Sequence, residues 1–265
     1  MELGVMIAVG YPPVPVEYQL ERLAACEIFR TEIYFHQWSD VLERHIYDLL
    51  HQFGIQAVSI HCYDKPDFNL ATFRESHRRH TLALLQQYLG IAERLHIPYV
   101  VVHPGRPLPA LLHPLAYPAL VGNLRRVEAL LQHSTVKIAV ENLPTGYVGA
   151  DVAALVSLLD RLNSPRMGLC LDTGHAHLNG GVDQALDQMQ SRLFTVHIHD
   201  NYGHRDEHLF PGQGTIGWQA VISKLQRIDF AGVFMLEIMD YLYRVPLEQA
   251  LEDVLRVKAW LHVER

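Results

Sequence analysis

An alternation of short apolar runs with longer amphipathic stretches, repeated eight times, is the feature that most constrains how this 265-residue chain can fold. The runs are rich in Val, Ile, Leu and aromatic residues, which is typical of strands buried on both faces. We predict strands at Leu3–Val9, Thr31–Phe35, Gln56–His61, Pro98–His103, Val136–Glu141, Met167–Asp172, Phe194–Ile198 and Val233–Glu237. We predict helices at Val16–Phe29, Asp40–Phe53, Phe73–Leu95, Ala116–His133, Ala150–Leu162, Val182–Gln190, Trp218–Arg227 and Leu247–Val263.

This order of elements predicts a closed barrel. Strands that alternate with helices join through right-handed crossovers into a parallel sheet. Eight such units in a chain of this length fit a closed barrel better than an open sheet. The predicted fold class is therefore α/β, a single (β/α)8 TIM barrel, with one domain over residues 1–265.

The segments that follow the predicted strands carry many of the residue types used in binding and catalysis. Examples are HPGRPLP after the fourth strand, ENLPTGYVG after the fifth and DTGHAHLNGG after the sixth. The longest such segment spans about residues 200–217, and long loops in compact domains are often functional. In a barrel these loops all open on one face, where active sites lie, so we expect the site there.

Charge and hydropathy indicate the partners and the location. The formal net charge is −7, whereas nucleic-acid-binding proteins usually carry a basic face, so duplex DNA is not an expected partner. No apolar run reaches the roughly 18 residues of a membrane span. Residues 1–10 are apolar but lack the basic flank and the cleavage site of a signal peptide. We expect a cytoplasmic protein that acts on a small molecule; its oligomeric state is not indicated.

The three cysteines predict no metal or disulfide framework. Cys26, Cys62 and Cys170 are widely spaced and form no CxxC pair, so we expect reduced and mostly buried thiols. Histidine is the more informative residue type, since the chain holds 17 of them.

Six consecutive predicted strands, the third to the eighth, each carry a residue that can bind a metal at or next to their last position. These residues are His61, His103, Glu141, Asp172, His197 and Glu237. One histidine or aspartate at a strand end is usually a hydrogen-bonded core or cap residue, but a barrel would bring all six around one cavity. Converging carboxylates and imidazoles without a cation would leave like charges buried, at several kcal/mol each. The sequence therefore predicts a divalent metal site.

Loop residues extend the candidate ligand set. His175 follows Asp172 by three residues, and Asp206 and His208 stand two apart. Mixed imidazole and carboxylate ligands suit Zn or Mn, and also Fe or Co. Zinc is favoured if several histidines bind, and Mn or Mg if only Glu141, Asp172, His197 and Glu237 do. Further histidines at 177, 199 and 204 are more typical of residues that do not bind the metal, and His199 lies either behind the ligands or at the rim.

Weaker motifs point to substrate binding. Gly212-Gln-Gly214 either cradles an oxyanion or forms a turn into the seventh predicted helix, and Arg106 either reaches a phosphate or is a solvated loop residue. We include Arg106, His199, Gly212 and Gly214 as candidate substrate-binding residues. The sequence has no GxxxxGKS, GxGxxG or GxSxG motif, so nothing indicates nucleotide cradling or a serine nucleophile.

Several motifs together resemble the xylose-isomerase-like barrel superfamily, also called the AP endonuclease family 2 group. They are SIH at 59–61, VVHPG at 101–105, VEN at 140–142, LDTGHA at 171–176, VHIHDN at 196–201, DEHLFPGQG at 206–214 and LEI at 236–238. Each motif is weak alone, but together they are specific and cover nearly the whole chain.

The resemblance to endonuclease IV, which holds three zinc ions, implies a complete ligand set. It places the first metal at His61 and His103, with Glu141 bridging to the second metal at Asp172, His197 and Glu237, and the third metal at His175, Asp206 and His208. The chain departs from endonuclease IV in its acidic charge and in a second loop, residues 36–39, without an arginine to wedge into a duplex. These departures put DNA in doubt but leave the implied metals in place.

The function we predict is hydrolysis of a small phosphoester or sugar-like substrate by a metal hydroxide at a multinuclear site, with up to three ions that are zinc by preference. Sugar isomerases and epimerases of the same superfamily imply the alternative, in which one ion polarises the sugar while Glu141 and Glu237 act as acid and base. A barrel that binds metal or ligand without catalysis is a third hypothesis.

Overall fold

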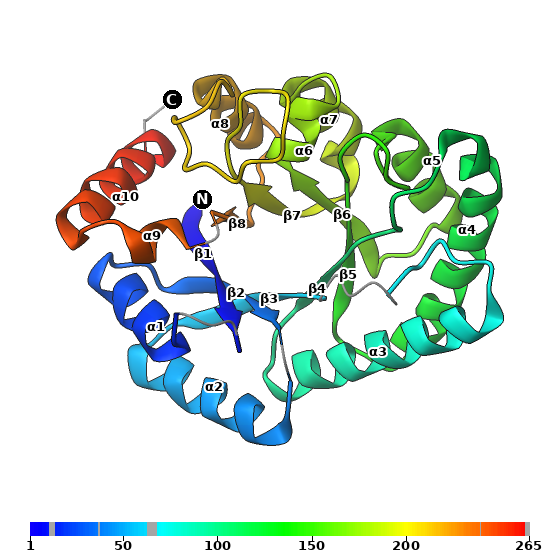
Figure 1. The fold of residues 1–265 in the computed structure, drawn as a ribbon, viewed down its shortest axis with the longest axis horizontal. Coiled ribbons are helices and arrows are strands. Elements are labelled where there is room, and N and C mark those ends of the chain that lie inside the picture. The colour runs from blue at the N-terminus through cyan, green and yellow to red at the C-terminus, as the bar shows by residue number, and fades with distance from the viewer. Residues whose placement is uncertain (11–13, 37, 63–67, 239, 263–265) are drawn as a thin grey trace.

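Eight parallel strands close into a barrel with helices around the outside, as the computed structural model shows (Figure 1). It describes residues 1–10, 14–36, 38–62, 68–238 and 240–262. The strands are β1 (Glu2–Val9), β2 (Arg30–Phe35), β3 (Gln56–His61), β4 (Tyr99–Val102), β5 (Lys137–Glu141), β6 (Met167–Asp172), β7 (Leu193–Ile198) and β8 (Val233–Leu236). Each strand pairs with the next in sequence, and β8 pairs with β1, which confirms the predicted fold class.

The helices follow the strands as the sequence predicts, with short additions. They are α1 (Val16–Ala25), α2 (Asp40–Phe53), α3 (Glu75–Arg94), α4 (His113–Leu131), α5 (Val152–Leu162), α6 (Thr173–Leu178), α7 (Val182–Met189), α8 (Trp218–Arg227), α9 (Tyr241–Arg244) and α10 (Leu247–Leu261), with 3-10 turns at Ala110–Leu112 and Gln190–Arg192. The sequence did not predict α6 and α9, because helices of six and four residues are too short for an apolar period. Among the described residues, no helix has the length and apolarity of a membrane span.

Local sequence sets where the elements begin and end. The Ser39 hydroxyl accepts a hydrogen bond from the Leu42 backbone N–H at the start of α2, and the helix ends at Gly54 with φ of 64°. In β1, Val5, Ile7 and Val9 are buried, while the alternate residues Met6 and Ala8 are partly exposed. These two residues line the cavity described below.

The cysteine prediction is confirmed: Cys26, Cys62 and Cys170 are free and buried. Burial raises the pKa of the Cys170 thiol to about 12, so this thiol stays protonated at neutral pH. It is therefore a packing residue of the barrel interior, where it lies with Val101 and Ala139.

Candidate metal centre

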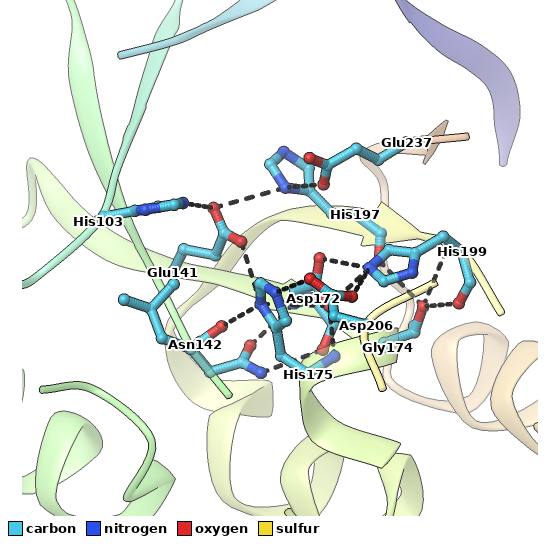
Figure 2. Close-up of polar contacts among 12 residues, drawn as sticks. His103, Glu141, Asn142, Asp172, Gly174, His175, His197, His199, Asp206 and Glu237 are labelled. Atoms are coloured by element: carbon cyan, nitrogen blue, oxygen red, sulfur yellow. Dashed lines mark hydrogen bonds and ion pairs between the residues drawn. The ribbon is translucent and has the colours of Figure 1, made fainter. Parts of the chain in front are cut away.

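Glu141 lies where the C-terminal ends of several strands meet. It ends β5 and is 1 % exposed. Its Oε2 atom lies 3.1 Å from His61 Nε2, 3.3 Å from His103 Nε2 and 3.6 Å from His197 Nδ1. Figure 2 shows its carboxylate directed toward His103 and His197 on one side and His175 on the other. One carboxylate that faces several imidazoles is the arrangement expected of a ligand that bridges two ions.

A second group of ligand atoms surrounds His197, which is fully buried on β7. Glu141, Asp172, His197 and Glu237 each offer an atom, and these atoms lie within 4.8 Å of one another. His197 Nδ1 and Glu237 Oε2 are 2.9 Å apart, yet they do not meet hydrogen-bond geometry, and neither has another hydrogen-bond partner among the described residues. Buried polar atoms without a hydrogen-bond partner lower the stability of the fold, and a cation bound between these two atoms would satisfy both.

A third group comes from α6 and the loop after β7. Asp206 Oδ2 lies 3.2 Å from His175 Nε2 and 3.3 Å from His208 Nε2. The Nδ1 atom of His175 is 2.9 Å from the Asn142 carbonyl oxygen, and that of His208 is 2.9 Å from the Glu237 carbonyl oxygen. A carbonyl only accepts, so both histidines carry a proton on Nδ1 and direct Nε2 toward Asp206.

The structure therefore brings all nine predicted ligands to one mouth of the barrel, in three adjoining groups. Which of them hold an ion, and how many ions bind, stays a prediction. The residues fit divalent metals because carboxylates alternate with imidazoles, and because buried ligand atoms such as His197 Nδ1 and Glu237 Oε2 have no hydrogen-bond partner among the described residues.

Carboxylates and imidazoles in this centre lie close enough to shift one another's pKa values. Burial opposes ionisation of Glu141, but His103 and His197 outweigh it and hold its pKa well below its usual range. Burial also disfavours charged His175 and His208, yet the neighbouring carboxylates prevail: the pKa of His175 lies well above its usual value, and that of His208 rises to about 9. Without metal, imidazolium groups thus neutralise the carboxylates of the cluster.

We predict that zinc binding releases protons at neutral pH. A histidine must be neutral to bind zinc, and both His175 and His208 are protonated at pH 7 without metal because their pKa values are raised. Calorimetric titrations with zinc in two buffers of different ionisation enthalpy should therefore give different apparent heats. Proton release should fall, and apparent affinity should rise, as the pH approaches 9. Equal heats in the two buffers at pH 7 would contradict the prediction.

His199 is buried within the centre, which agrees with the position behind the ligands and not with the one at the rim. It is fully buried, and its Nε2 atom lies 3.0 Å from both carboxylate oxygens of Asp172. Its ring stacks on His208 with centroids 4.0 Å apart. Gly174 makes room for it, since a Cβ on that residue would lie 1.9 Å from His199 Cε1. His199 thus orients Asp172, which also explains the glycine of the LDTGHA motif.

The glycines at 212 and 214 lie against a buried carboxylate of the protein itself. Asp200 accepts hydrogen bonds from the backbone N–H groups of Asn201, Gly212 and Ile216 and from the Trp218 indole. A Cβ on Gly214 would lie 2.3 Å from Asp200 Oδ1. These contacts support a structural role in the loop that carries Asp206 and His208, and a substrate-binding role for either glycine stays a prediction.

Arg106 lies in the loop after β4, where its carbonyl oxygen accepts from the Val148 N–H at 3.3 Å. It is not among the described residues that line the cavity, so its predicted contact with a phosphate gains no support.

A cavity of about 600 Å³ opens above the ligands. Seven of the nine candidate ligands line it, namely His61, His103, Glu141, His175, Asp206, His208 and Glu237. An apolar and aromatic wall completes it, contributed by Met6, Ala8, Val14, Tyr34, Leu143, Pro144, Tyr147 and Tyr243. The sequence did not predict this wall, although the i, i+2 spacing of Met6 and Ala8 on the first predicted strand places both on one face. The volume suits a small molecule.

A closed β/α barrel with histidine and carboxylate side chains gathered at the C-terminal ends of its strands has the architecture in which barrel enzymes form their active sites, and its ligand types suit a divalent metal. The chain belongs to the xylose isomerase-like TIM barrel family, whose model matches residues 23–261.

The relatives found by sequence include both an uncharacterized protein and a protein named as a probable endonuclease. The chain is 29 % identical over 199 residues to the uncharacterized protein MJ1311 of Methanocaldococcus jannaschii, covering 72 % of this chain and 68 % of the relative. It is 27 % identical over 192 residues to a probable endonuclease 4 of Sulfurihydrogenibium sp. strain YO3AOP1, covering 64 % and 67 %.

Solved structures share the fold over almost the full length. A D-tagatose 3-epimerase-like protein superposes with a TM-score of 0.83 at 24 % identity, covering 99 % of this chain and 98 % of the other. The IolI protein with a bound zinc atom superposes with a TM-score of 0.81 at 20 % identity, covering 98 % of both chains. At these identities the likeness establishes the fold.

Proposed function

We propose that this protein is a divalent-metal-dependent hydrolase of small phosphoesters, with a multinuclear site that holds up to three ions, zinc by preference. The observation that carries the proposal is the position of His61 and His103 on Glu141 Oε2, at 3.1 and 3.3 Å, together with His175 and His208 on Asp206. A mononuclear isomerase needs none of these four histidines as ligands. The relatives named as endonuclease 4 support the same reading.

The chain's own residues would hold the ions and the substrate in distinct ways. When bound, the ions would supply an activated water and stabilise charge on the phosphoryl group and the leaving oxygen. Glu141 would be shared by two ions, since its Oε2 atom borders His103 of the first ligand group and His197 of the second. The wall formed by Met6, Tyr34 and Leu143 would pack against the less polar part of the substrate.

Sugar isomerisation or epimerisation is the second candidate, and the epimerase-like neighbours favour it. In this reaction Glu141 and Glu237 would act as acid and base beside one ion. Both carboxylates border His197 Nδ1, at 3.6 and 2.9 Å, and both line the cavity. They are therefore placed to reach the same bound sugar.

Metal stoichiometry combined with turnover separates these candidates. We expect more than one zinc per chain by elemental analysis, and turnover of small phosphodiesters in preference to ketoses. If the protein binds one ion per chain under saturating zinc and turns over ketoses, the proposal of hydrolysis would have to be replaced by that of isomerisation. Metal binding without turnover of either substrate class would leave a binding protein.

Duplex DNA is a poor substrate in this proposal. The net charge of −7 gives little of the electrostatic affinity on which DNA binding depends. We expect negligible incision of an abasic-site duplex at physiological salt, compared with small phosphodiesters at the same enzyme concentration. Efficient incision that weakens as salt rises would show that a local basic surface binds DNA.

A further inference from the structure

A buried carboxylate lies behind the metal centre, on the side away from the cavity. Glu32 sits in the middle of β2 and is fully buried. Its Oε1 atom lies 2.9 Å from His197 Nε2, outside hydrogen-bond geometry, and its Oε2 atom accepts a hydrogen bond from the Ser59 hydroxyl. Ser59 is on the neighbouring strand β3, whereas His197 is on β7, so these contacts reach across the barrel interior.

A glutamate in this position needs an explanation, since burying a carboxylate costs several kcal/mol unless it is paired and hydrogen-bonded. No lysine or arginine in the described part of the chain forms an ion pair with Glu32. Among the described residues, the groups beside its carboxylate are the Ser59 hydroxyl, which donates to Oε2, and the fully buried imidazole of His197, which faces Oε1.

The two nitrogens of His197 face opposite ways. Nδ1 faces the metal centre, 2.9 Å from Glu237 Oε2 and 3.6 Å from Glu141 Oε2, while Nε2 faces Glu32. A neutral imidazole has one N–H group and one lone pair. A carboxylate oxygen lies 2.9 Å from each nitrogen, outside hydrogen-bond geometry in both cases, but only Nδ1 also borders Glu141. A metal at this group would take the Nδ1 lone pair and leave the proton on Nε2, where Glu32 faces it.

We propose that Glu32 is a positioning residue, which holds His197 in the Nε2–H form and thereby directs Nδ1 to a divalent ion shared with Glu141, Asp172 and Glu237. The inference rests on the metal site of the proposed function but not on the reaction. Ser59 has a supporting part, because its hydroxyl fixes the Glu32 carboxylate by the oxygen that does not face His197.

Graded variants test this role. Glu32→Gln keeps the shape but removes the charge, and Glu32→Leu removes both the charge and the acceptor. We expect zinc affinity at the His197 site, measured by competition with a chromogenic chelator, to fall about 10-fold in the first and about 100-fold in the second, the range typical of such outer partners. Ser59→Ala should weaken binding less than Glu32→Leu does.

Two controls separate positioning from a general loss of structure. Glu43→Gln removes another buried glutamate, which pairs with Arg94 on α3 outside the strand barrel, and should leave zinc affinity within about twofold. Binding by His175, Asp206 and His208 should also persist in the Glu32 variants, because Glu32 contacts none of them.

The tautomer itself provides a measurement on the wild-type protein, which keeps the proposal testable if a Glu32 variant does not fold. Long-range proton–nitrogen correlation spectra of the zinc-loaded protein with labelled histidine should show His197 protonated at Nε2 and bound through Nδ1. A proton on Nδ1, or zinc affinity unchanged in Glu32→Leu, would overturn the inference while leaving the metal site intact. Wild-type protein that binds no zinc would overturn the metal site and this inference together.

Discussion

His208→Ala is expected to remove one ion per chain and to lower phosphodiester turnover roughly 100- to 1000-fold, the equivalent of about 3–4 kcal/mol of transition-state stabilisation. The substitution takes away one of the two imidazoles that face Asp206 Oδ2 and leaves the groups around Glu141 and His197 intact. A hydrolase should lose the charge stabilisation that this ion supplies. Metal content and turnover must be measured on the same samples, because lost metal and lost chemistry look alike in rates.

His204→Ala is the matched control, since His204 is an exposed histidine of the same loop, and it should retain both metal and turnover. An isomerase would keep its single ion and most of its rate in His208→Ala. That outcome, together with a wild-type protein that binds one ion, would exclude the hydrolytic proposal.

Glu141→Ala is expected to have the larger effect and to abolish turnover in either chemistry. Glu141 lies within 3.6 Å of His61, His103, His175 and His197, so its loss disrupts two of the three ligand groups. If each lost ion removes several kcal/mol of stabilisation, turnover should fall by roughly 10,000-fold or more. Elemental analysis should find at most one zinc per chain, held by His175, Asp206 and His208.

Glu43→Gln again serves as the control for removing a buried glutamate outside the barrel. Two or more ions retained in Glu141→Ala would show that Glu141 does not bridge. This variant does not separate hydrolysis from isomerisation, which is why it complements His208→Ala.

The barrel could be predicted from sequence because each strand corresponds to an apolar run and each crossover helix to an amphipathic stretch. The strands are found within a few residues of their predicted bounds; β4 and β8 end one residue early, so His103 and Glu237 lie just beyond the strand pairing. The convergence of the ligands follows from the topology alone, since parallel strands in a closed barrel all end at the same mouth.

Residues whose role depends on contacts between distant strands could not be assigned in this way. Glu32 is a single acid within an apolar run, and only the closed barrel shows that it faces Ser59 and His197. The glycines at 212 and 214 predicted either an oxyanion cradle or a turn, and the structure shows that Gly212 donates to a neighbouring buried aspartate and that Gly214 packs against it. Sequence spacing shows which residue types occur together, but it does not show which other residue of the folded protein each of them contacts.

The hydrogen bonds to Asp200 have a consequence for how the third ligand group binds metal. Four donors and the bridge between Asp200 and Leu209 fasten the loop that carries Asp206 and His208 to the barrel. The conformational entropy of this loop is therefore lost when the chain folds, not when an ion arrives. Such a preorganised site should bind zinc with almost no change in heat capacity, unlike small zinc domains that fold around their metal.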